Sequence, residues 1–181
     1  MADADDLLGR LRERADAAGA PPPVDPGRVA AAEQELGFAL PPPLRAVYLQ
    51  VSNGGFGPGQ DIPIPGYSVA LLYSLARTVA AYQDARTPPD PTLPLWPWPQ
   101  GVLPVLYWGC FGHAAVDCHD EAGPVVMFEE DWVAKQPDGT WVVDQAWTVD
   151  APNLTTWWER WLTGGQVGTR GEIWTGWRGR L

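Results

Sequence analysis

Basic residues, and lysine above all, are scarce in this 181-residue chain. Lys135 is the only lysine, and Lys and Arg together number 12 against 22 acidic residues, for a formal net charge of −10. A protein that binds nucleic acid directly needs Lys and Arg to neutralise phosphates. The charge balance therefore disfavours DNA or RNA as a direct partner and favours a basic protein surface.

Long apolar runs are missing as well. No stretch approaches the roughly 20 apolar residues that span a bilayer. Met1 is followed by acidic residues and not by the basic and apolar segments of a secretory signal. The chain also has only two cysteines, too few for a disulfide framework. We expect a cytoplasmic protein with reduced thiols and no membrane partner.

Residues that commonly catalyse reactions or bind metals are few. Every cysteine and histidine falls in one segment, at Cys110, His113, Cys118 and His119. Cys and His are the preferred zinc ligands, but neighbours on a strand point to opposite faces, so Cys118 and His119 are poorly placed to share an ion. A Cys–His pair for nucleophilic catalysis is a further alternative. We favour a buried cysteine beside exposed histidines.

Known catalytic motifs are absent too. The sequence has no phosphate-binding loop, dinucleotide fingerprint or G-x-S-x-G motif. The acids of Glu129–Asp131 would suit a hard cation or paired acid–base catalysis, but adjacent acids at a strand end more often form a solvated turn. We therefore predict a protein that is not an enzyme, with no cofactor and no metal site.

The composition is that of a folded globular protein, with 45% hydrophobic and 19% charged residues. Apolar residues recur with helical spacing in five segments. Asp25, Ser74 and Asn153 are suitable N-cap residues for three of them. The predicted helices cover residues 3–18, 26–36, 44–51, 75–86 and 154–162.

Several short segments have the composition and flanking turns of β-strands. Short turns between successive strands imply antiparallel pairing. The predicted fold class is α+β, with a single antiparallel sheet of about four to six strands packed by N-terminal and C-terminal helices. The predicted strands are Val102–Trp108, Ala114–Cys118, Val125–Phe128 and Trp141–Trp147, with a further short strand at Val69–Tyr73.

The order of several motifs resembles one known family. The motifs are Glu33, Leu36-Gly37, Leu40-Pro41, Leu44-Arg45 and Asn53-Gly54-Gly55, followed by Leu103-Pro104-Val105, Trp108-Gly109 and Val116-Asp117. This series resembles the E-x-x-L-G-x-x-L-P-x-x-L-R…N-G-G opening and the following strands of the SUKH superfamily. That superfamily includes cell-wall regulators of Smi/Knr type and bacterial toxin-immunity proteins. The resemblance implies a SUKH-like domain over residues 25–163, after an N-terminal helix and proline linker (1–24) and before a C-terminal tail (164–181).

The resemblance also implies a function. A non-catalytic protein-binding domain is expected, most directly an immunity protein that binds and occludes a cognate polymorphic toxin, for example a nuclease. A regulatory or scaffold protein of Smi/Knr type, unrelated to toxins, is the alternative. A thiol or zinc enzyme using the Cys/His segment is a lesser one.

Charge and aromatic residues indicate where a partner would bind. Nine acidic residues lie between positions 117 and 150, against Lys135 as the single base. They form either a solvated sheet edge or a surface that steers a basic partner. Trp132 beside the Glu129–Asp131 acids would supply an aromatic anchor. Trp96 and Trp98 alternate with prolines and either cover the core, which we favour, or serve as exposed anchors. The predicted partner-binding residues are Trp96, Trp98, Asp117, Glu129, Glu130, Asp131 and Trp132.

Overall fold

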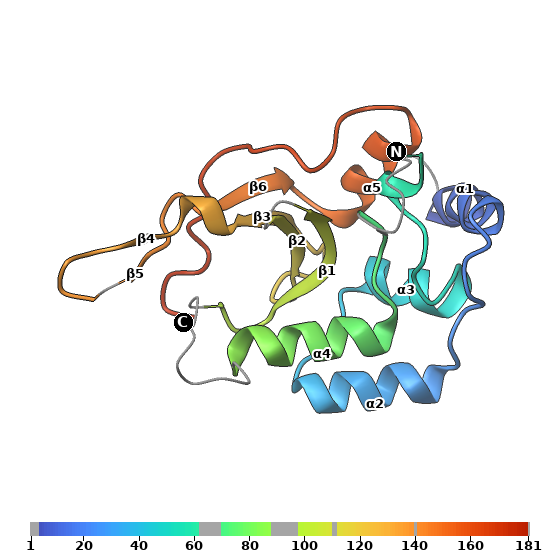
Figure 1. Ribbon diagram of the computed structural model, residues 1–181. Coiled ribbons are helices and arrows are strands. Elements are labelled where there is room, and N and C mark those ends of the chain that lie inside the picture. The colour runs from blue at the N-terminus through green and yellow to red at the C-terminus, as the bar shows by residue number, and fades with distance from the viewer. Residues whose placement is uncertain (1–3, 62–69, 88–97, 110–111, 140, 181) are drawn as a thin grey trace.

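A four-stranded antiparallel sheet with helices packed against both of its edge strands forms the body of the molecule (Figure 1). The computed structural model describes residues 4–61, 70–87, 98–109, 112–139 and 141–180. The predicted α+β class is confirmed. No helix within these ranges is both long and apolar enough to cross a membrane.

Three helices begin at the predicted capping residues. The Asp25 carboxylate accepts a hydrogen bond from the Arg28 amide at 3.1 Å, and Gly37 ends that helix with a φ of 79°. Ser74 and Asn153 cap two later helices in the same way. The α-helices among the described residues are α1 (Ala4–Ala17), α2 (Pro26–Leu36), α3 (Pro42–Gln50), α4 (Leu75–Arg86) and α5 (Leu154–Leu162).

Side chains of the N-terminal motif hold the connections between these helices. The Glu33 carboxylate accepts a hydrogen bond from the Leu40 amide at 3.0 Å and lies 3.7 Å from the Arg45 guanidinium. Asn53 Oδ1 accepts from the Leu75 amide at 2.9 Å and so helps to start α4. Gly54 has a φ of 75°, and a Cβ there would lie 2.5 Å from the Tyr73 backbone. The motif therefore specifies the helical framework.

The sheet has the order β1-β2-β3-β6, with all neighbours antiparallel. A separate hairpin of two short strands is inserted before β6. The strands are β1 (Val102–Gly109), β2 (Gly112–Asp117), β3 (Val125–Glu129), β4 (Ala134–Lys135), β5 (Trp141–Val142) and β6 (Trp147–Ala151).

One predicted strand is wrong in its extent. The segment Trp141–Trp147 is not continuous, because a turn in which the Ala146 amide donates to the Val143 carbonyl at 3.0 Å divides it. Its first residues form β5 of the projecting hairpin, and Trp147 begins β6 of the main sheet. Asp144 lies in this turn, where short polar side chains such as Asp are favoured over strand interiors.

Irregular segments cover both edges of the sheet. The amides of Ala70 and Tyr73 donate to β1 carbonyls at 2.7 and 2.8 Å. Residues 70–73 nevertheless do not form the predicted strand, because the φ of 55° at Ala70 interrupts the extended backbone. Val69 lies outside the described residues. At the opposite edge, the Val149 amide of β6 donates to the Glu172 carbonyl of the C-terminal tail at 2.8 Å. The Trp174 amide of the tail donates to the Trp147 carbonyl of β6 at 2.9 Å. Covered edges cannot pair with another chain.

Aromatic side chains fill two clusters of the core. Trp147 contacts Phe128 and Trp98, with ring centroids 4.7 and 4.9 Å apart. In the other cluster Trp158 stacks on Phe56 at 5.6 Å and meets Trp157 edge to face. The tail joins the first cluster, because Trp174 packs on Trp147 at 5.5 Å and is buried. The position of this tail did not follow from the sequence.

Asp150 joins three elements through one buried carboxylate. Its side chain has no solvent exposure and accepts hydrogen bonds from Trp157 Nε1 at 2.6 Å and from the Gly168 amide at 2.7 Å. The Arg160 guanidinium pairs with it at 3.3 Å. The sheet, α5 and the tail thus meet at this residue. A buried ion pair is costly to break from one side, because the remaining polar groups lose their partner.

We expect Asp150→Ala to lower the free energy of unfolding by about 3 kcal/mol or more. The variant leaves the Trp157 indole N–H and the Arg160 guanidinium without their carboxylate. Chemical denaturation measures the change. Asp144→Ala is the matched control, because Asp144 forms an exposed pair with Arg178 at 3.6 Å and should cost less than about 1 kcal/mol. Equal effects of the two variants would contradict the role assigned to Asp150.

Candidate partner-binding surface

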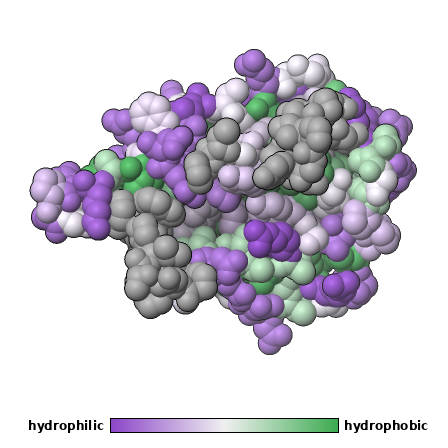
Figure 2. All heavy atoms as spheres, in the orientation of Figure 1, coloured by the Kyte–Doolittle hydropathy of each residue, from purple (hydrophilic) through white to green (hydrophobic). Residues whose placement is uncertain are grey.

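A short helical turn connects β3 to the projecting hairpin. This turn, η2 (Glu130–Trp132), follows directly on Glu129, the last residue of β3. The hairpin of β4 and β5 extends beyond it, away from the helices (Figure 1). Its tip is covered by hydrophilic residues (Figure 2). Three of the predicted contact residues, Glu130, Asp131 and Trp132, therefore lie at the base of a protrusion, and we call them the η2 surface.

Trp132 is the aromatic residue of the η2 surface and is 47% exposed. The Arg170 guanidinium lies over its ring, 4.1 Å from the centroid. Glu129 pairs with the same guanidinium, which also donates to the Gln145 carbonyl at 2.7 Å. Trp132 is thus held in one orientation by the C-terminal tail while half of its surface stays open to solvent.

The two acids of the η2 surface are not neutralised. None of the ion pairs that the structure shows among the described residues involves the Glu130 or Asp131 carboxylate. Partial burial, followed by the neighbouring Asp131 charge, raises the pKa of the Glu130 carboxyl. A cation brought close to Glu130 would offset both effects.

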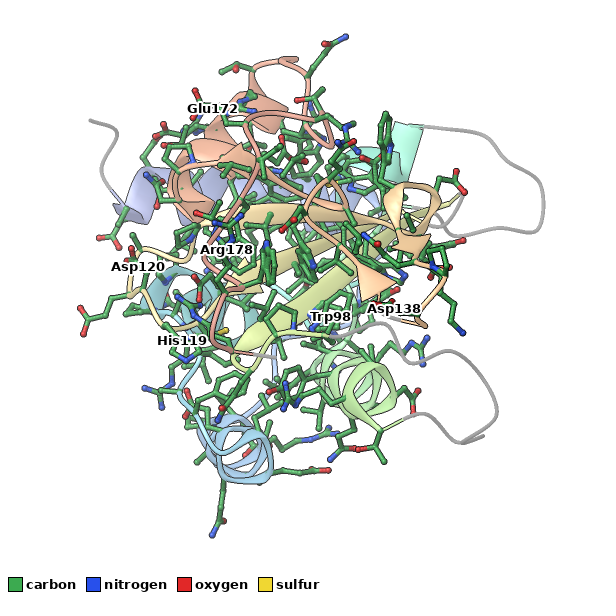
Figure 3. The ribbon with its side chains drawn as sticks, turned by 90° about the vertical axis from the view of Figure 1, so that its left-hand side faces the viewer. Trp98, His119, Asp120, Asp138, Glu172 and Arg178 are labelled. Carbon is green, nitrogen blue, oxygen red and sulfur yellow. The ribbon has the colours of Figure 1, made fainter. Side chains whose placement is uncertain are left out.

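The nine acids of positions 117–150 do not form one continuous face. Asp120 lies far from Asp138 in the view of Figure 3. Four of the nine pair with arginines, three of which belong to the tail. The pairs are Asp117–Arg180, Glu129–Arg170, Asp144–Arg178 and Asp150–Arg160. The sequence showed these tail arginines but gave no sign of where the tail would dock.

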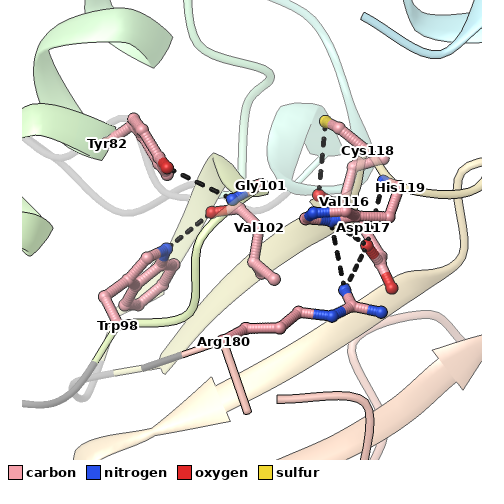
Figure 4. A network of polar contacts seen from close by, with 9 residues as sticks. All are labelled: Tyr82, Trp98, Gly101, Val102, Val116, Asp117, Cys118, His119 and Arg180. Carbon is pink, nitrogen blue, oxygen red and sulfur yellow. Dashed lines mark hydrogen bonds and ion pairs between the residues drawn. The ribbon is translucent and has the colours of Figure 1, made fainter. Parts of the chain in front are cut away.

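Asp117, a predicted contact residue, is buried. Its carboxylate accepts hydrogen bonds from Arg180 Nη1 at 2.8 Å and from the His119 amide at 3.1 Å (Figure 4). His119 Nδ1 lies 3.3 Å from the same carboxylate and is the exposed member of the group. This network fastens the end of the tail to β2 and does not offer Asp117 to a partner.

Trp98 is buried as well, with 6% of its surface exposed. It lies between α4 and the sheet (Figure 3), and its indole N–H donates to the Val102 carbonyl at 2.6 Å (Figure 4). Trp98 therefore covers the core, as we favoured. Trp96 lies outside the described residues.

The Cys/His segment shows no arrangement for metal binding or thiol chemistry in the part that the structure describes. Burial, followed by the Asp117 charge, raises the pKa of the Cys118 thiol, and its S–H faces the Val116 carbonyl at 3.6 Å. A thiol with a raised pKa is a weak nucleophile. No group of three His, Cys, Asp or Glu side chains is placed to hold a metal ion among the described residues. Cys110 lies outside them.

His113 projects from β2 into an aromatic environment. Its ring lies 5.0 Å from Tyr107 and 6.1 Å from Trp98, and its Nδ1 is buried without a hydrogen-bond partner in the described structure. Burial, followed by the Arg77 charge, lowers the pKa of His113 from 6.5 to about 4. His113 is therefore neutral at physiological pH, a property that its sequence position did not reveal.

The lowered pKa predicts a specific pH dependence of stability. Between pH 6.5 and 4 the unfolded chain binds a proton at His113 that the folded chain does not, so folding stability falls as the pH is lowered. The His113 contribution to this loss between pH 7 and 5 is about 2 kcal/mol. Chemical denaturation at both pH values gives the change in the free energy of unfolding for the unchanged protein and for His113→Gln. The difference between these two changes is the His113 contribution. A His113→Gln curve parallel to that of the unchanged protein would contradict the assignment.

Comparison with known protein families identifies the family to which this chain is similar. A family model described as "SMI1 / KNR4 family (SUKH-1)" matches residues 23–160. The matched segment extends from the residues before α2 into α5, and so includes the sheet and the η2 surface. It ends before Arg170 and the rest of the docked tail. A search of curated proteins found no match to this chain.

Proposed function

The chain belongs to the SMI1/KNR4 (SUKH-1) family, and we propose that it is an immunity protein that neutralises a cognate polymorphic toxin by direct binding. Membership of this family fits a non-catalytic binding or immunity role. The toxin would present a basic surface, as a nuclease does around its active site, and occlusion of that surface would block its activity. The protein would act in the cytoplasm, where it would meet the toxin before damage occurs.

One observation carries the proposal: an exposed tryptophan stands beside two carboxylates that take part in none of the ion pairs seen among the described residues. Half-exposed tryptophans held in a fixed orientation are typical anchors of protein interfaces. Unpaired carboxylates beside such an anchor favour a basic partner and speed its approach. The η2 surface lies at the base of the projecting hairpin (Figure 1).

A regulatory or scaffold role of Smi/Knr type is the alternative. The same surface would then bind a cellular protein and give no protection against a toxin. The deciding experiment is co-expression with the C-terminal domain of a large secreted protein encoded beside this gene. Rescue from toxicity together with a co-purifying complex supports immunity. Toxicity without rescue contradicts it and favours the regulatory role.

Charge reversal within the η2 surface should slow the association with the toxin. We expect Asp131→Lys to lower the association rate constant about tenfold at low salt, with a smaller effect at high salt. Stopped-flow or surface plasmon resonance measurements at two ionic strengths test this. Glu121→Lys makes the same charge change at the exposed β2–β3 turn and should have a smaller effect. Equal rates for the two variants, or rates independent of salt, would contradict electrostatic steering towards this surface.

Truncation of the aromatic anchor should act on dissociation instead. Trp132→Ala is expected to weaken the complex about 30-fold or more, mainly through a faster dissociation rate, because the loss of a central anchor costs about 2 kcal/mol or more. The matched control is Ile173→Ala, which truncates the other large hydrophobic side chain that is exposed among the described residues, at 52% exposure. Unchanged affinity of Trp132→Ala, with normal folding, would exclude Trp132 from the interface.

A further inference from the structure

A pocket of about 240 Å³ opens beside the η2 surface, between α4 and the face of the sheet. α4 contributes Arg77 and Asp84 to its wall, and β2 and β3 contribute His113 and Phe128. Trp98 and Glu130 line it as well. Glu130 therefore belongs both to the η2 surface and to this pocket, so that one feature continues into the other.

The charged side chains that line the pocket have a net charge of −1. Arg77 is its cation and lies over the Tyr73 ring, 5.5 Å from the centroid. Asp84 and Glu130 are its carboxylates, and neither has a hydrogen-bonded or ion-paired side-chain partner among the described residues. Two carboxylates against one guanidinium favour an occupant with a single positive charge.

The interior of the pocket is aromatic and contains an unsatisfied polar atom. Trp98 and Phe128 present their rings, which pack edge to face with centroids 5.3 Å apart. The buried Nδ1 of His113 has no partner in the described structure. An unsatisfied buried polar atom carries a desolvation cost that an incoming hydrogen-bonding group would remove. The neutral state of His113 leaves one ring nitrogen free to accept such a bond.

The neighbouring contact of Arg170 shows which side chain this chemistry suits. There the protein already places an arginine between a carboxylate, Glu129, and an indole, Trp132. Guanidinium groups stack on aromatic rings and supply five donors to surrounding acceptors, which an ammonium group does not do. The pocket offers the same combination, and its volume is below that of ordinary small-molecule sites but sufficient for one side chain.

We propose that this pocket receives an arginine side chain of the partner protein, with its guanidinium between Asp84 and Glu130 and its stem against Trp98. This inference rests on the proposed function for the existence of a partner, but it defines the residue that the partner inserts. The η2 surface would then guide a basic protein, and the pocket would fix its orientation. Buried arginines are common among the residues that dominate interface affinity.

The test uses a single amino-acid analogue and needs no toxin. Nα-acetyl-arginine N-methylamide is titrated into the ¹⁵N-labelled protein, and the Trp98 indole N–H signal is followed by NMR. The uncharged isostere, Nα-acetyl-citrulline N-methylamide, is titrated in parallel. We expect a saturable shift with the arginine analogue. The citrulline analogue should bind at least about tenfold more weakly.

Two neighbouring substitutions provide the matched control. Glu130→Gln and Asp131→Asn each remove one charge from the η2 surface, but only Glu130 lines the pocket. Glu130→Gln should weaken the analogue about fivefold or more, and Asp131→Asn less than about twofold. No saturable shift, equal binding of both analogues or equal losses in the two variants would overturn the proposal. Arginine binding without rescue in the co-expression experiment would support the pocket and reject the immunity function, so the two failures are distinguishable.

Discussion

The buried carboxylate of Asp150 is the interaction on which the arrangement of the sheet, the closing helix and the tail depends. Asp150 belongs to β6, the last strand of the sheet. Its carboxylate accepts hydrogen bonds from α5 and from the tail at the same time. Because a buried charge is tolerated only when its hydrogen bonds are complete, α5 and the tail are both required around it. The docked tail then covers the open edge of β6 and adds Trp174 to the aromatic core. Removal of the carboxylate therefore affects the sheet, α5 and the tail together.

The same docking determines the electrostatics of the surface. The tail arginines pair with Glu129, Asp144 and Asp117, three of the acids that a view of the sequence alone would assign to one negative face. Glu130 and Asp131 take part in none of the ion pairs that the structure shows among the described residues, and they stand beside a tryptophan that Arg170 holds in place. The tail thus has two effects: it stabilises the sheet edge and restricts the region that a basic partner would find attractive.

Local signals predicted the helices and most strands correctly, because caps, prolines and apolar spacing act over a few residues. Asp25, Gly37, Ser74 and Asn153 behave as their types predict. One error was local, and another arose where a distant part of the chain decides the outcome. Trp141–Trp147 has the composition of one strand, but a turn assigns its ends to two different sheets. Asp117 has the composition of a surface acid, but Arg180, 63 residues further along the chain, covers it. No local pattern contains the information that pairs Asp117 with Arg180 or places His113 beside Trp98.

The residues that identify the family and those that form the candidate site have separate tasks. Glu33 and Asn53 bind backbone amides and fix how the helices connect, and Gly54 fits where a larger residue would collide with the chain. Substitution there would disturb the framework. Glu130, Asp131 and Trp132 are exposed or half-exposed and make few contacts that the fold requires. Their side chains can change at little cost in stability. The framework can therefore stay constant while the η2 surface adapts to different partners, which is the physical requirement for one fold to serve many binding specificities.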